Sequence, residues 1–360
     1  MRVRVGLSLL AACAAVPLAA QTTIQPASAE PRQGFGAKQA AAVVEKLATT
    51  LDENFVFPEV GKAYAARLRQ QLKEGAYSSF RDGNSFAEKV TSDLQAVHKD
   101  GHLRLLVVPV ADRGGPEAAL RPTGANDGST IVKSGWLADG VAYINFRMFS
   151  GNDATIKELK AFLDTHRDAK TLIIDARQHR GGGLAEMDLM FPQLFTAPTP
   201  LVQMDTREAV DRRGGNPLDD LASLRKVRAP AGVVRREHFV TPAANQGGLA
   251  KAKVYLLTSQ RTASAGEHLA LSLKRTHRAT LVGETTRGAG HYGSMVPLDE
   301  GFTYAAFIPV GRTFDPDTNE GWEGTGVKPD VAVTADKALD EALKLAGVSA
   351  RGDAALAALR

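Results

Sequence analysis

Short apolar runs alternate with amphipathic helical segments between residues 141 and 283, and this alternation limits the fold more than any other feature of the chain. The apolar runs are Val141–Phe146, Thr171–Asp175, Val254–Thr258 and Ala279–Gly283, and helical periodicity fills residues 153–166, 184–195 and 263–276. Strands that alternate with helices are typical of a mostly parallel sheet with helices packed on it. The sequence therefore predicts an α/β core.

Two helical regions flank this core. Apolar residues recur at helical spacing three times between residues 37 and 99, which predicts a small three-helix bundle. The segment 336–360 is rich in Ala and Leu and predicts a helical tail, so the core would span residues 100–335. Residues 205–250 carry many charges, glycines and prolines with weak periodicity, and we expect a long surface loop there, of the kind that forms lids or substrate walls.

The N-terminus resembles a secretory signal. Arg2 and Arg4 precede an apolar run that ends at Ala20 and is too short and poorly flanked for a stable membrane span. A small-x-small site ends at Ala29, which predicts a signal peptide over residues 1–29 and a periplasmic or secreted protein. A weaker cleavage site follows Ala20, and Cys13 offers an alternative reading as a lipoprotein anchor.

Composition excludes several classes of function. The 44 Lys and Arg residues nearly balance the 40 Asp and Glu residues, with no basic block, so nucleic acid is not an expected partner. Cleavage after Ala29 would remove two arginines, lowering the net charge of +4 by two, and would also remove the one cysteine. The mature chain could then use neither a cysteine nucleophile nor a thiolate metal site.

Two segments carry the candidate chemistry. Ser264 follows the run Val254–Thr258 and opens a helix, so its hydroxyl would be exposed beside free backbone N–H groups, although serine also serves commonly as a plain helix cap. Gly181, Gly182 and Gly183 follow the run Thr171–Asp175. Glycines at such a turn let backbone amides approach an anion closely, whereas neither a phosphate loop nor a dinucleotide fingerprint fits their spacing.

Seven motifs in chain order resemble those of the tail-specific, or C-terminal processing, serine peptidases, whose relatives include the tricorn core peptidase and the repeats of interphotoreceptor retinoid-binding protein. They are Phe55-Val56-Phe57-Pro58, Asp100-Gly101-His102-Leu103, Val141-Ala142-Tyr143-Ile144, Asp175-Ala176-Arg177 with its glycines, Thr262 to Glu267, Val282-Gly283-Glu284-Thr285-Thr286, and Gly324 to Asp330. The resemblance implies a crotonase-like or Clp-peptidase-like β-α spiral preceded by a helical domain. It also implies a peptide or protein substrate. Only about 30 residues separate Val110 from Val141, which leaves no room for the peptide-binding PDZ domain that the processing peptidases insert.

The resemblance also implies roles for particular residues. Ser264 matches the nucleophile, and the amides of Ala265 and of Gly181 or Gly182 would bind the oxyanion. Ala289 stands where the Ser-Lys enzymes of the family carry their lysine, so a histidine base is expected instead. By analogy with the tricorn branch, we expect His102 as the base and Glu323 as the carboxylate that orients it.

Other residues remain as alternatives to these. Glu320 could replace Glu323, and His291 is the second candidate base because it lies two residues beyond Ala289. His179 stands where relatives usually have Asn.

No metal or cofactor is expected. His98 and His102 have helical spacing, but a helix should end near Gly101, which spoils the geometry of a zinc site. We predict an exported serine hydrolase that forms an acyl-enzyme and is most simply a peptidase. The alternatives are an esterase, or a non-catalytic binding protein for a hydrophobic ligand on the same fold.

Overall fold

The computed structural model describes residues 35–109, 128–214, 218 and 221–360, so the predicted signal peptide and Cys13 lie outside the described residues. The helices are α1 (Ala37–Asn54), α2 (Pro58–Lys73), α3 (Gly83–Val97), α5 (Asp153–Thr165), α6 (Ala185–Leu194), α7 (Glu208–Arg213), α8 (Ala265–Arg275), α9 (Ala338–Leu345), α10 (Gly352–Ala357) and the short 3-10 helix η2 (Gly248–Lys251). The strands are β1 (Leu105–Val107), β2 (Ile131–Ala138), β3 (Val141–Phe146), β4 (Thr171–Asp175), β5 (Thr199–Arg207), β6 (Leu224–Val227), β7 (Val233–Val240), β8 (Lys253–Thr258), β9 (Thr280–Gly283), β10 (His291–Pro297), β11 (Tyr304–Phe314) and β12 (Val331–Ala332). None of the described helices combines the length and apolar character of a bilayer-spanning segment.

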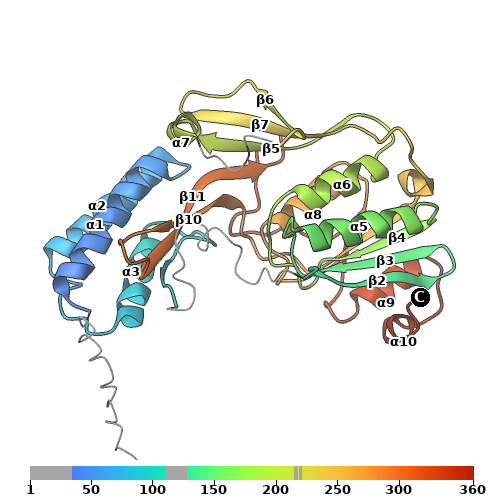
Figure 1. The fold of residues 1–360 in the computed structure, drawn as a ribbon, viewed down its shortest axis with the longest axis horizontal. Helices are drawn as coiled ribbons and strands as arrows, with labels where there is room; N and C mark the ends of the chain where they lie inside the picture. The colour runs from blue at the N-terminus through green and yellow to red at the C-terminus, as the bar shows by residue number, and fades with distance from the viewer. Residues whose placement is uncertain (1–34, 110–127, 215–217, 219–220) are drawn as a thin grey trace, which may run out of the picture. The chain divides into compact units, whose positions relative to one another are not determined.

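The predicted α/β core is confirmed. One sheet has the strand order β12-β9-β8-β4-β3-β2, with parallel pairing throughout except for the antiparallel edge strand β2. Helices α5, α6 and α8 cover one face of this sheet and α9 and α10 cover the other (Figure 1). Each position of β4 is buried, with Leu172 and Ile174 packed toward α5, α6 and α8, and Ile173 toward α9. Burial on both faces explains why the central strands read as continuous apolar runs.

The N-terminal helical region is also confirmed, but its core extends beyond the helices. A second, antiparallel sheet has the order β1-β11-β5-β7-β6, and β10 pairs with β11. Helices α1, α2 and α3 bury one continuous cluster against it, in which Leu47 and Phe86 from the helices meet Tyr304 and Ile308 from β11. The helices are therefore completed by strands that lie about 200 residues later in the chain.

The expectation of a long surface loop over residues 205–250 is wrong. This stretch contains the end of β5, α7, β6 and β7, which extend the second sheet. Its charges pair across the ladder, as in the ion pair of Arg235 with Asp205 (2.6 Å) and the pair of Arg225 with Glu237. A strand is ordinarily identified in sequence by alternating apolar residues. Here paired charges on adjacent strands take the place of that alternation, so the sequence of this stretch predicts a loop.

The parallel core brings the two candidate catalytic segments together. Strands β4 and β8 are direct neighbours, with Asp175 opposite Leu257 at their carboxyl ends. The glycine segment 181–183 follows β4, and Ser264 follows β8, so both emerge at the same edge of the sheet. A hydrogen bond from the Ala263 N–H to the carbonyl of His179 (3.0 Å) joins the two loops directly.

Candidate active site

Ser264 lies at the turn between β8 and α8 with an unusual backbone. Its φ of 55° and ψ of −116° place a non-glycine residue in a region that costs about 1–3 kcal/mol and persists only where the surroundings impose it. Sharp turns of this kind between a strand and a helix expose a nucleophilic serine above a sheet. Such strain is not needed for a plain helix cap, whose backbone is ordinarily extended.

Glu267, in the first turn of α8, holds this strained turn from beneath. The buried carboxylate accepts hydrogen bonds from the N–H of Ser264 (2.8 Å), the hydroxyl of Thr286 (2.6 Å), and the N–H groups of Gly288 (2.6 Å) and Ala289 (2.9 Å). Burial raises the pKa of Glu267, and these four donors act against that rise. Glu267 thereby links the nucleophile to the segment that leads to β10.

The glycine segment approaches Ser264 more closely than any side chain would allow. Gly181 has φ of 111°, and a Cβ there would lie 2.9 Å from the Cβ of Ser264. Its N–H donates to Nδ1 of His179 (3.2 Å), so this amide is already engaged. The N–H of Gly182 has no acceptor among the described residues, and Ala265, as the first residue of α8, has no helical partner for its N–H. Of the two glycines predicted for the oxyanion hole, Gly182 is thus the one whose N–H has no acceptor in the described part of the chain.

His179 supports this loop from inside the protein. The residue is fully buried, and burial lowers its pKa to about 3, so the ring is neutral at ordinary pH. Because Nδ1 accepts the Gly181 N–H, the ring proton is on Nε2. The ring also packs edge-on against Phe149. His179 is thus a support for the glycine loop.

His291, at the start of β10, is paired with Asp100. Its Nδ1 lies 2.7 Å from Oδ2 of Asp100, and the Asp100 side chain is fully enclosed. Burial alone would raise the pKa of Asp100, but the hydrogen bond from His291 and those from the N–H groups of His102 and Leu103 outweigh it and lower this pKa. A carboxylate on Nδ1 leaves Nε2 of the imidazole as a proton acceptor.

Glu323 contacts backbone around His291. One of its oxygens accepts the N–H of Gly101 (2.6 Å), and the other accepts the N–H groups of Gly290 and His291 (3.0 Å for the latter). Its distance to Nδ1 of His291 is 3.9 Å. Glu320, the alternative carboxylate, is exposed.

The side chain of His102 does not line the cavity that contains Ser264. Its ring stacks on Phe307 with centroids 4.9 Å apart, and its buried Nδ1 has no hydrogen-bond partner in the described part of the chain. Burial lowers the pKa of this ring. His102 contributes its backbone N–H to Asp100 (2.8 Å).

A cavity of about 340 Å³ unites the nucleophile with His291. Its lining contains Ser264, Ala265, Gly182, Gly183 and His291, and does not contain His102 or any lysine from the described residues. A second cavity of about 450 Å³ adjoins it and shares Gly290, His291 and Thr313. His291 therefore separates two hollows, one of which contains Ser264.

Asp100, His291 and Glu323 also form the one cluster in the described part of the chain with the spacing of metal ligands, each offering an atom within 4.8 Å of the others. The ligand atoms already have partners, since Asp100 bonds to His291 and both oxygens of Glu323 accept backbone N–H groups. The donor set is thus satisfied by hydrogen bonds within the chain.

Comparisons with known families agree with this arrangement. Residues 140–333 match the model of peptidase family S41, and residues 37–128 match the N-terminal domain of peptidase S41 in eukaryotic IRBP. The chain belongs to peptidase family S41. It is accordingly a serine-type peptidase, a hydrolase whose substrates are peptides or proteins.

Solved structures share the fold of this S41 peptidase at low sequence identity. A putative peptidase from Parabacteroides merdae is 15% identical with a TM-score of 0.53, and the match covers 90% of this chain and 96% of that one. A lipoprotein from Streptococcus agalactiae is 12% identical with a TM-score of 0.52, covering 86% and 96%. The tricorn protease is 13% identical with a TM-score of 0.53, covering 89% of this chain and 36% of that chain.

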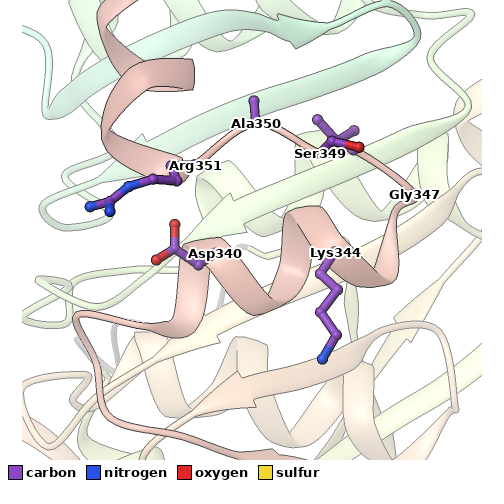
Figure 2. A pocket seen from close by; sticks show the side chains of 7 residues that line it. Asp340, Lys344, Gly347, Ser349, Ala350 and Arg351 are labelled. Carbon is purple, nitrogen blue, oxygen red and sulfur yellow. The ribbon is translucent and has the colours of Figure 1, made fainter.

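A further hollow of about 490 Å³ lies at the C-terminal helices of this S41 chain. Figure 2 shows Asp340 and Lys344 on α9, and Arg351 where the chain enters the next helix. Oδ1 of Asp340 accepts the N–H of Gly352 (2.6 Å), so this carboxylate caps α10. None of the residues around Ser264 lines this hollow, and we assign it no part in catalysis.

Sequence reasoning missed two residues of this site. The sequence predicts no separate role for Asp100, although an acidic residue before Gly-His in its motif is a signal that could have identified it. The sequence places Glu267 only within the serine motif, because its role as an acceptor for two segments depends on contacts with Thr286 and Gly288.

Proposed function

We propose that this S41 peptidase cleaves peptide bonds through an acyl-enzyme on Ser264, with His291 as the base and Asp100 as the carboxylate that orients it. The single observation that carries the proposal is the shared cavity: Ser264 and His291 both line it, and Nδ1 of His291 is hydrogen-bonded to Asp100. This assignment puts His291 in the role first expected of His102, and Asp100 in the role expected of Glu323.

The proposed reaction follows from these contacts. The hydroxyl of Ser264 attacks the scissile carbonyl while Nε2 of His291 accepts its proton, and the N–H groups of Gly182 and Ala265 bind the oxyanion. His291 then gives the proton to the leaving amine, so the C–N bond breaks and an ester to Ser264 remains. A water molecule, deprotonated by the same nitrogen, hydrolyses that ester and restores the hydroxyl.

Asp100 supports this cycle electrostatically. The lowered pKa keeps it ionised at neutral pH, where it accepts a hydrogen bond from the Nδ1–H of His291 and stabilises the imidazolium that forms during attack. Phe55 and Phe57 pack edge-on against the His291 ring and restrict its orientation. Glu323 acts in this proposal as a clamp that keeps the backbone of Gly101 beside that of His291.

Reaction with a fluorophosphonate probe tests the assignment. Wild-type protein should label and hydrolyse a peptide substrate, and Ser264→Ala should do neither. The decisive comparison is His291→Ala with His102→Ala, since the first should lose labelling and the second should retain most of it. Labelling that survives His291→Ala and disappears in His102→Ala would reverse the assignment. Wild-type protein that never labels but binds an apolar ligand would favour the binding-protein alternative.

We also propose that the chain is exported. The support is the sequence alone: two arginines, an apolar run and a small-x-small site before Glu30. Expression of the full chain followed by cell fractionation and N-terminal sequencing tests this. A mature N-terminus at Glu30 or Gln21 in the exported fraction is expected, and a lipid-modified Cys13 would show anchoring instead. Full-length protein confined to the cytoplasm would contradict export.

A further inference from the structure

Three side chains outside the proposed catalytic groups form a hydrogen-bonded chain that ends at the cavity of Ser264. Oδ1 of Asp188, on α6, lies 3.2 Å from Nε2 of His238 on β7. Nδ1 of His238 lies 2.8 Å from Nε2 of His268 on α8. Both histidines are buried, with 1% and 3% of their surface exposed. Nothing in the reaction described above uses these residues.

His268 occupies a position where it can meet a substrate. It lies one helical turn after Ser264 and lines the same cavity, whose other walls include the apolar side chains of Leu184, Met204 and Leu221. The hydrogen bond to His238 occupies Nε2, and Nδ1 of His268 has no partner among the described residues. His268 therefore has one unused polar atom in a largely apolar cavity.

The positions of the protons along this series of hydrogen bonds determine whether Nδ1 of His268 is a donor or an acceptor. The carboxylate of Asp188 accepts, so Nε2 of His238 carries a proton, and in the neutral ring Nδ1 of His238 is then an acceptor. The bond between the two rings therefore uses the proton on Nε2 of His268, which leaves Nδ1 of His268 unprotonated. Burial lowers the pKa of His268, which keeps its ring neutral. The unused atom is thus a hydrogen-bond acceptor.

We propose that His268 makes this peptidase selective for substrates whose residue on the amino side of the scissile bond has an apolar stem and an uncharged hydrogen-bond donor, as tyrosine and glutamine do. The proposal rests on the function proposed above, because it places the acyl part of the substrate in the cavity beside Ser264 and Gly182. Asp188 and His238 are positioning residues that fix the tautomer of His268. A cation such as lysine is disfavoured because the walls are apolar.

Paired peptides that differ by one polar group test this selectivity. Wild-type enzyme should cleave a peptide with Tyr at this position with a kcat/KM about fivefold above that of the Phe peptide, the effect of one neutral hydrogen bond. His268→Leu should bring the ratio to one or below, and His268→Gln, which keeps an acceptor, should restore part of it. His166→Leu is the matched control, because His166 is also a buried histidine but its Nδ1 is bonded to the carbonyl of Phe162 and it does not line the cavity.

A readout without turnover separates this proposal from the catalytic one. In a Ser264→Ala background, equilibrium binding of the same peptides should show the Tyr preference, and adding His268→Leu should remove it. His238→Phe should lower the preference, whereas His166→Leu should leave both the preference and the rate of labelling by a small fluorophosphonate unchanged. A Tyr to Phe ratio that is the same with and without His268, in turnover or in binding, would overturn the proposal. Loss of labelling in the wild type would instead contradict the proposed catalysis, and the binding ratio would still decide the role of His268.

Discussion

Replacing His179 by asparagine should make the protein less sensitive to acid. His179 is fully buried, and its Nδ1 accepts the N–H of Gly181 at the glycine loop. The side-chain oxygen of an asparagine can accept the same N–H but does not titrate. The variant therefore keeps the hydrogen bond and removes the proton-binding group.

The magnitude follows from the two pKa values of His179. Burial lowers its pKa to about 3 in the folded protein, while the unfolded chain should have the ordinary value of about 6.5. Below pH 6.5 the unfolded chain binds a proton that the folded protein does not, so stability falls as the pH falls, by about 1.4 kcal/mol per pH unit. Between pH 7.5 and pH 5.0 this group alone should cost about 2 kcal/mol of unfolding free energy.

Urea unfolding at a series of pH values, followed by circular dichroism, measures this difference. The unfolding free energy of wild-type protein should fall by about 2 kcal/mol more than that of His179→Asn over the stated range. The lowered pKa values of His102, His166 and His268 act in the same direction, but they are present in both proteins and cancel in the comparison. His277→Asn is the control, because His277 is exposed, and it should keep the wild-type pH dependence. Equal pH dependence of wild type and His179→Asn would refute the reasoning.

Three further predictions concern the contacts around the nucleophile and the proposed base. Gly181→Ala should lower kcat by about 100-fold because its Cβ would displace Ser264. Gly183→Ala is the control, because the space around its Cβ is open, and it should keep near wild-type activity. An equal loss of activity in both variants would contradict the argument from close approach. Glu267→Gln should destabilise the fold by about 2–4 kcal/mol, because the amide nitrogen that replaces one oxygen would face two hydrogen-bond donors. Urea or thermal unfolding measures this change. An unchanged unfolding midpoint would show that the four hydrogen bonds are not needed for stability. Asp100→Asn should leave the fold intact and lower kcat by about 10⁴-fold through the wrong tautomer of the base, and full activity in that variant would remove Asp100 from the proposed mechanism.

The parts of the fold that depend on local pattern could be predicted from the sequence. The runs at β3, β4 and β8 are buried on both faces, so each is apolar at nearly every position and identifies itself. The segment from β5 to β7 could not be identified in this way, because Asp205 lies beneath Arg235 and Arg312 and its burial depends on those partners. Asp205 is only 3% exposed, but the sequence alone does not distinguish such a buried charge from a charge on the surface.

The residues of the site also differ in whether a local sequence pattern can predict them. Ser264 and the glycine segment could be predicted because both directly follow a strand of the parallel sheet, and the ends of adjacent parallel strands meet. The pairing of His291 with Asp100 joins residues separated by 191 positions. No local pattern distinguishes that pair from His102 with Glu323, since all four residues lie in segments that reach the same region.

The motif at residues 100–103 correctly marked a segment that reaches the site, but its histidine, His102, is not the residue that pairs with His291. Oδ1 of Asp100 is held by the N–H groups of His102 and Leu103, which turns Oδ2 toward His291. The same turn directs the ring of His102 onto Phe307, away from the cavity. In our proposal the N-terminal side of the molecule therefore supplies the carboxylate and β10 supplies the base. Glu323, by accepting N–H groups from Gly101 and His291, keeps the two segments in register without contacting the substrate itself.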